Sequence, residues 1–489
     1  MKQWMAGILT VILGVVSIPH VMAANLSRDD LSVEVRETLE RELGNFRLRD
    51  IRKSTEDGKT VFQISATGRQ SVRLNMIIDE HGNLLDKVNQ VQLRVVDNQL
   101  KRERGNFWIQ SLYTPEAGDP EQAPGALIES LSTVCYAGGN ILVFDLHGLT
   151  PDGKELTEAA KEFYQQAIDR LLYIKLNSIC RIFNSNSPQD PAYRMNAVRT
   201  VADYFKDENH MIFVIDGPNA AELAQEFKKL APDLTVAAPG ADLAITESEP
   251  VAADPLTIAL RNSLPDRNSG RQHFILRNTP ENLKALDERN SSSEEMQSWI
   301  PDNSILAQEE REEGFVALFD GKTKNGWLPS APNQGFIVKD GELQCQPGRG
   351  SIRTVKRFDD FILRFDYKIE DRGNSGAQVR APRSSRASKI GFEVQIFGDY
   401  GDKPSKDGTG AIYNVLAPTE NASRPAGEWN SMEITCNGPH VRVILNGKTV
   451  QDINLDEYEE LKYRLRDGFI ILTDHGADVS YRNIRIREL

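Results

Sequence analysis

A short segment, GFEVQIF at residues 391–397, carries side chains that could perform acid–base chemistry. Glu393 and Gln395 alternate in it with Phe392, Val394 and Ile396, as expected for a β-strand with one polar face. A carboxylate can accept a proton and an amide can bind a hydroxyl, provided that the face they share lines a cleft. This segment therefore gives the first candidate site residues.

Two further segments show the same alternation. In AQVRAP, Gln378 and Arg380 share a face, and in ILTDHG, Thr473 and His475 share one while Asp474 points the other way. Amides together with Arg and His suit sugar hydroxyls, whereas solvated faces favour Lys, Glu, Thr and Ser. Alternation alone does not decide between the floor of a cleft and an ordinary solvated face.

These segments belong to a run of short predicted strands that extends over residues 313–489. The strands are bounded by Gly, Asn, Asp or Pro, and Asn446-Gly447 in LNGK suits a type I′ hairpin turn. Short strands at regular spacing with such turn signals predict an antiparallel β-sandwich or jelly roll.

The same region resembles the 3-keto-disaccharide hydrolase family, whose members are exported bacterial proteins with a concanavalin A-like jelly roll. The resemblance covers about residues 313–489 and says nothing about residues 25–312. Where the family often has Gln two positions before its His, this sequence has Thr473. The motifs that match in order are GFVALFDGKTKNGW, VKDGELQC, DDFILRFDYKIEDRGNSGAQVRAP, GFEVQIFGDYG, GAIYNVLAP, PAGEWNSMEITCNG, VRVILNG and ILTDHGADVSYRNIRIREL.

The resemblance implies cleavage of glycosides that are already oxidised to a ketone at C3, by proton removal at C2, loss of the aglycone and hydration. The ketone acidifies the C2 proton, so Glu393 is the expected base and His475 its acid–base partner. Asp474 would position the histidine or shape its turn, and Arg380 would stabilise the enediolate. The expected hydroxyl ligands are Gln378, Gln395, Asn374 and Tyr413.

Each role has a plainer alternative. Glu393 could form a salt bridge with Arg380 across the sheet, and His475 could be a turn residue packed against an aromatic ring. Asn374, in RGNSG, could occupy a left-handed turn. A divalent metal could stabilise the enediolate in place of Arg380, with Glu393, His475 and Asp474 as ligands, and no other cofactor is implied.

Other functions also fit a jelly roll with a polar face. The main alternative is a non-catalytic, lectin-like carbohydrate-binding module. A two-carboxylate glycosidase would need a second acid about 5–9.5 Å from Glu393, and the sequence shows no corresponding motif. A structural or partner-binding role is a further alternative.

The N-terminal residues 1–24 predict a signal peptide. Lys2 precedes an apolar run from about Met5 to Ile18, and the small residues of VMAA supply a cleavage site. The run is short for a bilayer span, although an uncleaved anchor is the alternative. No later stretch is long and apolar enough to cross a membrane. We therefore expect an exported protein, periplasmic or extracellular, with a carbohydrate substrate and an oligomeric state that the sequence does not indicate.

Residues 25–104 predict a small α+β domain. Leu31, Val35, Leu39 and Leu43 recur at intervals of four, which predicts an amphipathic helix closed by Gly44, and two or three strands follow. This pattern resembles the PepSY-like domains of exported bacterial proteins.

Residues 105–290 alternate between apolar strands and helices, which predicts an α/β layer domain. Asp145 with His147, and Asp216, follow buried strands and form a candidate site there, because ligands bind at the carboxyl ends of parallel strands. No motif assigns this domain a function. Residues 291–312 are acidic and polar and predict a linker.

Composition narrows the functional classes. A length of 489 residues predicts two to four domains. The net charge of −13 and the absence of a basic stripe argue against a nucleic-acid partner. The four cysteines contain no CxxC pair, so they are either disulfides permitted by export or buried free thiols.

Overall fold

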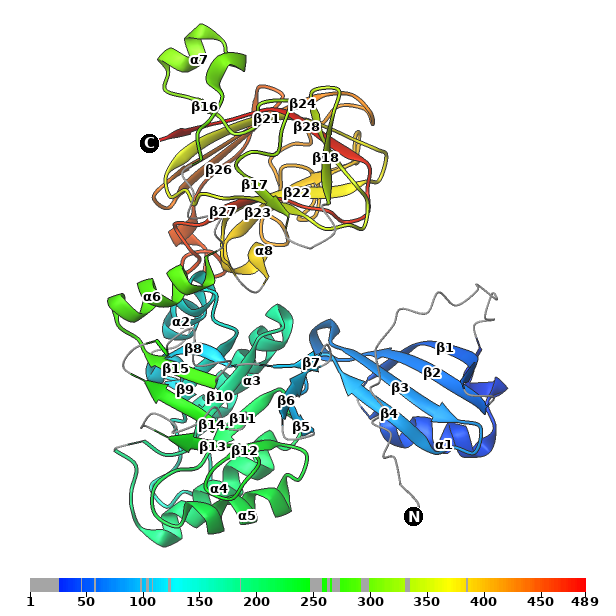
Figure 1. Ribbon diagram of the computed structural model, residues 1–489, viewed down its shortest axis with the longest axis vertical. Coiled ribbons are helices and arrows are strands. Elements are labelled where there is room, and N and C mark those ends of the chain that lie inside the picture. Colours follow the sequence, from blue (N-terminus) through cyan, green and yellow to red (C-terminus); the bar gives the residue numbers. More distant parts are fainter. Residues whose placement is uncertain are drawn as a thin grey trace, which may run out of the picture. The chain divides into compact units, whose positions relative to one another are not determined.

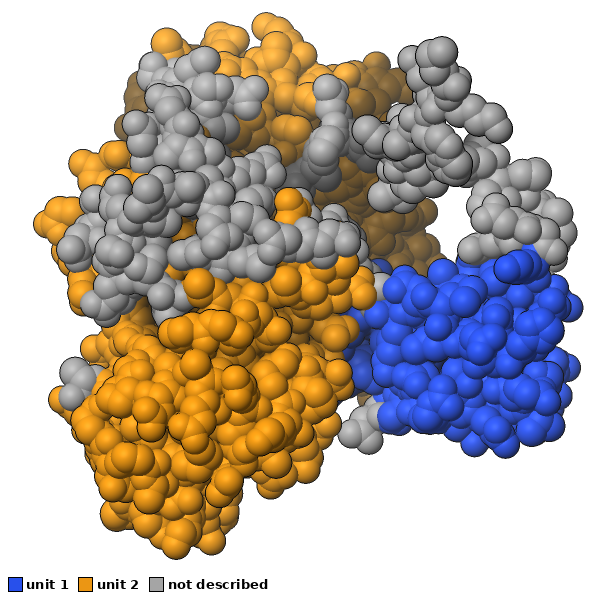
Figure 2. Space-filling model, turned by 60° about the horizontal axis from the view of Figure 1, so that its bottom comes forward, with its two compact units in different colours: residues 1–90 blue, residues 91–489 orange. Residues whose placement is uncertain are grey.

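The chain divides into two compact units, residues 1–90 and residues 91–489 (Figure 2). The predicted signal peptide lies outside the residues that the structure, a computed structural model, describes. The described residues are 26–44, 46–56, 59–96, 99–102, 105–107, 109–121, 125–184, 186–246, 257–261, 264–265, 273–291, 299–329, 335–383 and 386–489.

The first unit is an antiparallel sheet with one helix. Four strands pair in sequence order, and the apolar residues at intervals of four on α1 are buried against them. Gly44 ends the helix with a positive φ of 51°, as predicted from the sequence. The elements are α1 (Val33–Leu43), β1 (Arg47–Glu56), β2 (Lys59–Thr67), β3 (Arg73–Asp79) and β4 (Leu84–Asn89).

The second unit begins with a parallel sheet of eight strands (Figure 1). The strands pair in sequence order, the last pairs with the first, and a parallel bridge between Ala237 and Leu243 joins β12 to the start of β13. The ring is therefore closed. The strands are β8 (Gln110–Tyr113), β9 (Ile141–Asp145), β10 (Asn177–Arg181), β11 (Met211–Val214), β12 (Thr235–Ala237), β13 (Ala244–Thr246), β14 (Thr257–Arg261) and β15 (His273–Arg277).

This closed ring corrects the predicted layer domain. Alternation of strands and helices is common to open sheets and barrels, so the sequence pattern could not distinguish them. Side chains from every strand of the ring or its flanks fill one apolar core, as in other parallel α/β barrels. They include Ile109, Ile141, Val143, Ile179, Ile212, Val214, Ala237, Leu243, Ile258 and Ile275.

A small sheet closes the amino-terminal end of the barrel. Leu93 and Leu100 join the barrel core, and the carbonyl of Leu93 accepts a hydrogen bond from Thr235. Residues 91–107 thus belong to the barrel and not to the N-terminal domain, whose predicted limit was residue 104. The strands are β5 (Arg94–Val96), β6 (Gln99–Arg102) and β7 (Gly105–Asn106).

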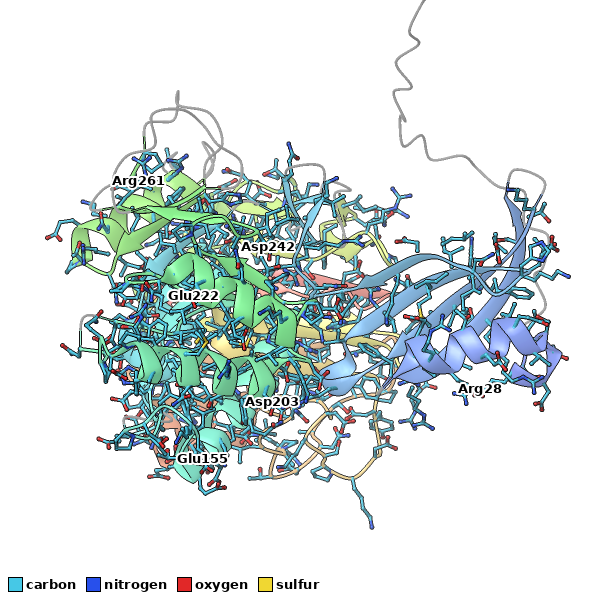
Figure 3. The ribbon with its side chains drawn as sticks, turned by 90° about the horizontal axis from the view of Figure 1, so that it is seen from below. Arg28, Glu155, Asp203, Glu222, Asp242 and Arg261 are labelled. Atoms are coloured by element: carbon cyan, nitrogen blue, oxygen red, sulfur yellow. The ribbon has the colours of Figure 1, made fainter. Side chains whose placement is uncertain are left out.

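Helices cover the outside of the barrel and present charge to solvent. Asp203 on α4 and Glu222 on α5 are exposed (Figure 3), whereas the apolar residues of both helices face the strands. The helices are α2 (Gly125–Tyr136), α3 (Glu158–Ile174), α4 (Pro191–Phe205), α5 (Ala220–Leu230) and α6 (Pro280–Asn290). None of the described helices has the length and apolar character needed to cross a membrane.

The C-terminal part is the predicted antiparallel β-sandwich. One sheet has the order β18-β19-β28-β21-β24-β25-β26, with β16 also paired to β28, and the other has the order β17-β20-β27-β22-β23. The strands and helices are β16 (Val316–Ala317), β17 (Trp327–Pro329), β18 (Phe336–Lys339), β19 (Glu342–Cys345), β20 (Ile352–Thr354), β21 (Phe361–Ile369), β22 (Asn374–Ala381), α8 (Ala387–Ile390), β23 (Phe392–Phe397), β24 (Asn430–Asn437), β25 (His440–Leu445), β26 (Lys448–Asn454), β27 (Phe469–Leu472) and β28 (Val479–Glu488).

The described part of the predicted linker, residues 299–312, is attached to the sandwich. Trp299 packs against the sandwich core, and Leu306 is buried with Phe315 and Ala317. A short helix, α7 (Gln308–Glu312), follows. The acidic composition of this segment reflects its exposed face, while a few apolar residues fix it to the domain.

A polar network joins the sandwich to the barrel within the second unit. Arg357 binds Asp287 of α6 through two hydrogen bonds of 2.6 and 2.7 Å, and Arg383 donates to the same carboxylate at 3.1 Å. The hydroxyl of Tyr136 on α2 donates to Asp467 at 2.8 Å. The side chains of Arg357 and Asp287 are only 15% and 20% exposed.

We expect Asp287→Ala to lower the free energy of unfolding by about 2–4 kcal/mol, because it leaves two largely buried guanidinium groups without their carboxylate. Chemical denaturation of the full chain measures this change. Asp203→Ala is the matched control, because Asp203 pairs with Lys206 on an exposed surface. Equal stability of the two variants would contradict the expectation.

Candidate active site

The three segments singled out in the sequence come together in the five-stranded sheet. Strand β22 lies between β23 and β27, and Gln378 is directly opposite Glu393 on β23 and opposite Ile471 on β27. His475 follows the end of β27 by three residues. Gln378 and His475 therefore both lie beside Glu393.

Glu393 is buried in the wall of the sheet. Its side chain is 4% exposed, and its Oε2 accepts a hydrogen bond of 3.3 Å from Nε2 of Gln378. Oε1 has no hydrogen-bond partner among the described residues. A side chain at Gly376 would overlap this oxygen, so the glycine provides the space that the carboxyl group occupies.

Burial raises the pKa of Glu393 to about 7 from its ordinary value of 4.5. The hydrogen bonds from Gln378 and Thr473 and the positive charges of Arg386 and Lys389 act in the opposite direction but do not compensate for the lost solvation. A carboxyl group with such a pKa can both accept and return a proton near neutral pH.

His475 lies beside Glu393 at the entrance to this region. Its Nε2 is 4.0 Å from Oε1 of Glu393, and its side chain is 46% exposed. Burial lowers the pKa of His475, the negative charge of Asp474 raises it, and the positive charge of Arg386 lowers it further, with a net lowering. The imidazole is therefore mainly neutral at neutral pH.

Asp474 shapes the loop that carries His475. Its carboxylate accepts hydrogen bonds from the backbone N–H groups of Gly348, Gly350 and Gly476, at 3.1, 2.7 and 2.8 Å. Burial favours a higher pKa for Asp474, but the three N–H donors outweigh it and the pKa is lowered. This arrangement matches the turn-shaping role that was one of the two roles predicted for Asp474.

Arg380 does not join the site, which corrects its predicted position. The register of β22 with β27 shifts between Gln378 and Ala381, and Arg380 has a φ of 50°. This bulge reverses the alternation on which the prediction rested. The guanidinium is fully buried, where it pairs with Asp360 at 2.8 Å and donates to the carbonyl of Gly438. The alternative of a Glu393–Arg380 salt bridge is excluded by the same placement.

The predicted hydroxyl ligands lie along β22 and β23 but differ in accessibility. Gln395 is 2% exposed, and its Nε2 donates to Oδ1 of Asn374 at 3.0 Å. Asn374 begins β22 and is half-buried, so it is a strand residue and not a left-handed turn residue. Tyr413 is half-buried and its backbone N–H donates to the carbonyl of Glu393. Thr473 is buried and bonded to the backbone of Gly376.

Two cations on α8 were not identified from the sequence. The charges of Arg386 and Lys389 both act on Glu393. The ammonium group of Lys389 lies 5.9 Å from the centre of the Tyr413 ring. Lys389 comes only four residues before Glu393, but it lies on α8 and not on the strand, so the alternation of strand residues gave no signal for it.

The expected metal alternative does not fit this geometry. Both oxygens of Asp474 are bound by backbone N–H groups, so its carboxylate is not free to join Glu393 and His475 as a third ligand. Within the described ranges, no group of three His, Cys, Asp or Glu side chains is arranged to hold a metal ion.

The residues predicted as a second site in the barrel form a paired polar network. Tyr113 donates to Asp145 at 2.6 Å, and Arg181 bonds both Tyr113 and Asp216, at 3.0 and 2.8 Å. Burial raises the pKa of Asp145 despite the hydrogen bond from Tyr113. His147 is held through its backbone by the hydroxyl of Tyr164, outside this chain of side-chain contacts. The network gives the barrel no assigned chemistry.

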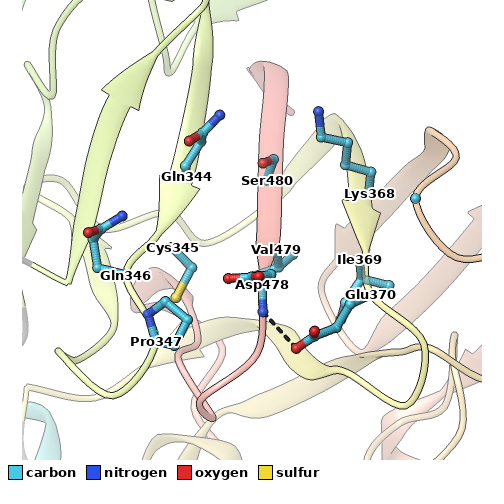
Figure 4. Close-up of a pocket in the computed structure, with 11 residues that line it drawn as sticks. Gln344, Cys345, Gln346, Pro347, Lys368, Ile369, Glu370, Asp478, Val479 and Ser480 are labelled. Carbon is cyan, nitrogen blue, oxygen red and sulfur yellow. Dashed lines mark hydrogen bonds between the residues drawn. The ribbon is translucent and has the colours of Figure 1, made fainter.

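A separate pocket of about 480 Å³ lies among strands β19, β21 and β28 of the other sheet (Figure 4). It is lined by Gln344, Cys345, Gln346, Pro347, Lys368, Ile369, Glu370, Gly427, Asp478, Val479 and Ser480. Neither Glu393 nor His475 is among them, so the pocket is distinct from the acid–base pair. Cys345, like Cys135, Cys180 and Cys436, is a buried free thiol.

Comparisons with known proteins indicate the family of the C-terminal domain. Residues 314–487 match the family described as the 3-keto-alpha-glucoside-1,2-lyase-like domain. A curated relative, 3-keto-disaccharide hydrolase from Bacteroides thetaiotaomicron, is 24% identical over 229 residues, which cover 36% of this chain and 79% of the relative. The comparisons do not support the PepSY-like resemblance, which stays a prediction.

Solved structures that are similar to part of this chain include a protein from Parabacteroides distasonis described as a glycosyl hydrolase. It is 27% identical, with a TM-score of 0.34, and the match covers 38% of this chain and all of that one, 100%. A carbohydrate-binding module from Bacillus subtilis is 16% identical, with a TM-score of 0.25, over 33% of this chain and 94% of that one. The assignment rests on the family match and not on these structures.

Residues 314–487 therefore belong to the family of 3-keto-alpha-glucoside-1,2-lyase-like domains, and the prediction of a hydrolase domain at the C-terminus is confirmed.

Proposed function

We propose that the C-terminal domain cleaves 3-keto-glycosides by elimination followed by hydration, with Glu393 as the base. The observation that carries this proposal is the buried Glu393 carboxyl group with His475 Nε2 at 4.0 Å. The name of the curated relative, a 3-keto-disaccharide hydrolase, supports the substrate class.

The first step removes the C2 proton. The adjacent C3 ketone acidifies this proton, and ionised Glu393 accepts it while the electron pair forms an enediolate with the ketone oxygen. Because the pKa of Glu393 is about 7, the ionised form is well populated at neutral pH and is more basic than an ordinary carboxylate.

The second step releases the aglycone. The enediolate electrons return and the C1–O bond breaks, while the proton taken by Glu393 passes to the neutral imidazole of His475 and then to the leaving oxygen. Water adds afterwards to the C1–C2 double bond and places hydroxyl at C1 and a proton at C2. The sum of these steps is hydrolysis, with no oxidant or reductant consumed.

The positive charge predicted for Arg380 must come from other residues. Arg386 and Lys389 act electrostatically on Glu393, and Arg386 also acts on His475. A cation at this position stabilises the developing enediolate oxygen. Gln378 and Tyr413 are the half-buried neighbours that remain available to sugar hydroxyls.

Export, to the periplasm or the extracellular space, is part of the proposal. It rests on the apolar N-terminal segment and the small residues that follow it. The N-terminal unit and the barrel receive no catalytic role of their own.

We expect the full chain to release the aglycone from 3-keto-trehalose or a 3-keto-β-glucoside, with kcat/KM rising as pH passes through about 7, where Glu393 ionises. Glu393→Gln and His475→Ala should each lower kcat by about 100-fold or more, because each removes a proton-transfer group. Release of the aglycone, followed by chromatography, is the measurement.

Matched control substitutions distinguish a loss of turnover that is specific to the site from a general effect of substitution on the domain. Glu457→Gln and His440→Ala replace exposed residues of the same domain, and we expect both to retain full turnover. Turnover that survives Glu393→Gln would place the chemistry elsewhere. Binding of the sugar without any turnover by the unsubstituted chain would identify a carbohydrate-binding module.

A second prediction concerns stability and needs no substrate. Because the folded pKa of Glu393, about 7, exceeds its ordinary 4.5, this residue stabilises the fold fully below about pH 4.5, and the contribution is lost as pH rises through 7. The loss is roughly 3 kcal/mol. Glu393→Gln should remove that part of the pH dependence, measured by denaturant unfolding at several pH values. Parallel curves for the two proteins would show that Glu393 has an ordinary pKa.

A further inference from the structure

One aromatic residue of the barrel reaches the α8 side of the candidate site. Tyr173 lies at the C-terminal end of α3, more than two hundred residues before Glu393 in the sequence. The guanidinium carbon of Arg386 is 4.7 Å from the centre of its ring, and Nζ of Lys389 is 4.9 Å from the same point. Tyr173 thus contacts the two cations that act on Glu393.

These contacts restrain two long side chains. Arg386 is exposed and Lys389 half-buried, and both belong to α8 or its first flanking residue. Without a partner, the side chains of Arg386 and Lys389 could extend into water at little cost in free energy, because a flexible cation is well hydrated there. The negative face of an aromatic ring attracts a cation placed over it. This attraction favours one position of each side chain.

The backbone of α8 is fixed independently of Tyr173. Arg464 donates to the carbonyls of Ser388 and Gly391, at 3.1 and 3.2 Å, and Leu465 donates to the carbonyl of Ile390. Loss of the Tyr173 ring would therefore release the side chains of Arg386 and Lys389 while α8 stays in place.

The groups that face Glu393 come from several elements. The cations are Arg386 and Lys389 of α8, and His475 from the loop after β27 is mainly neutral. Two phenols, Tyr413 and Tyr481, also interact with its charge, and burial raises the pKa of both. Gln378 of β22 and Thr473 after β27 are neutral donors. Arg386 and Lys389 are thus the positive charges acting on Glu393 among the described residues.

We propose that Tyr173 is a positioning residue of the C-terminal site: its ring holds Arg386 and Lys389 beside Glu393, so that the barrel completes the charge environment of the base. This inference rests on the proposed role of Glu393 as the base. It gives the barrel a part in the reaction, although Tyr173 itself does not touch the reacting atoms.

The direction in which the pKa of Glu393 moves when Tyr173 is removed distinguishes this positioning role from simple exclusion of water. If Tyr173 holds the cations, its removal weakens the positive field and the pKa of Glu393 rises further above about 7. If Tyr173 only excluded water, its removal would improve the solvation of Glu393 and lower the pKa. The two roles therefore predict shifts of opposite sign.

The test compares Tyr173→Ala and Tyr173→Phe with the unsubstituted full chain. The infrared carbonyl band of protonated Glu393, identified because Glu393→Gln removes it, is titrated with pH. We expect Tyr173→Ala to move the midpoint upward by about 0.5 pH unit or more. Tyr173→Phe keeps the ring under both cations but loses the hydroxyl that hydrogen-bonds Lys389, so its midpoint should lie between those of Tyr173→Ala and the unsubstituted chain. The acid limb of kcat/KM should move with the midpoint.

The interface control is Tyr136→Ala. Tyr136 also carries a cation over its ring, Arg357 at 3.9 Å, but it lies on α2 and acts on neither Arg386 nor Lys389 in the described contacts. An unchanged or lowered midpoint in Tyr173→Ala would overturn the proposal, as would an equal rise in Tyr136→Ala. A raised midpoint in a chain that turns over no 3-keto-glycoside would uphold the positioning role and reject the proposed reaction.

Discussion

The burial of one carboxyl group, that of Glu393, is the constraint around which the C-terminal site is built. A carboxylate that is 4% exposed loses most of its hydration, and this loss must be balanced or the group takes a proton. The structure balances it only in part: Gly376 leaves the space, Gln378 gives one hydrogen bond, and two cations stand nearby. Because this compensation is incomplete, the pKa of Glu393 rises into the neutral range. A carboxylate whose lost hydration was fully replaced by hydrogen bonds and cations would keep a low pKa and be a poor base.

The sandwich and the barrel contribute different groups to the site, and this difference follows from the same constraint. The sheet supplies the buried acid and its rigid neighbours, because strands fix side chains through their hydrogen-bonded register. The cations come from α8, whose long side chains require a partner to stay near the sheet. That partner is on the barrel, so a domain without assigned chemistry of its own contacts the side chains that adjust the site.

The sandwich and the polar strand faces that carry Gln378 and Glu393 could be predicted from the sequence, because strand alternation has a period of two and survives without tertiary information. Arg380 was misplaced because one bulge reverses the period, and the local sequence does not mark it. The barrel was taken for a layered sheet because closure depends on β15 pairing with β8, a contact that no local pattern specifies. Tyr173 was missed for the same reason, since its relation to Glu393 exists only after folding.

The ring has a seam where its last strand meets its first, with Phe274 opposite Gln110. Gln110 bonds both Asn290 at the end of α6 and Gly138 after α2, so the same seam brings these two helices together. The sandwich docks on residues of both helices through Arg357, which bonds Asp287 and the carbonyl of Tyr136. The docking surface therefore does not exist until synthesis has passed α6 and the ring has closed. Because the sandwich follows α6 in the chain, the barrel residues that form this docking surface all precede the sandwich in the sequence.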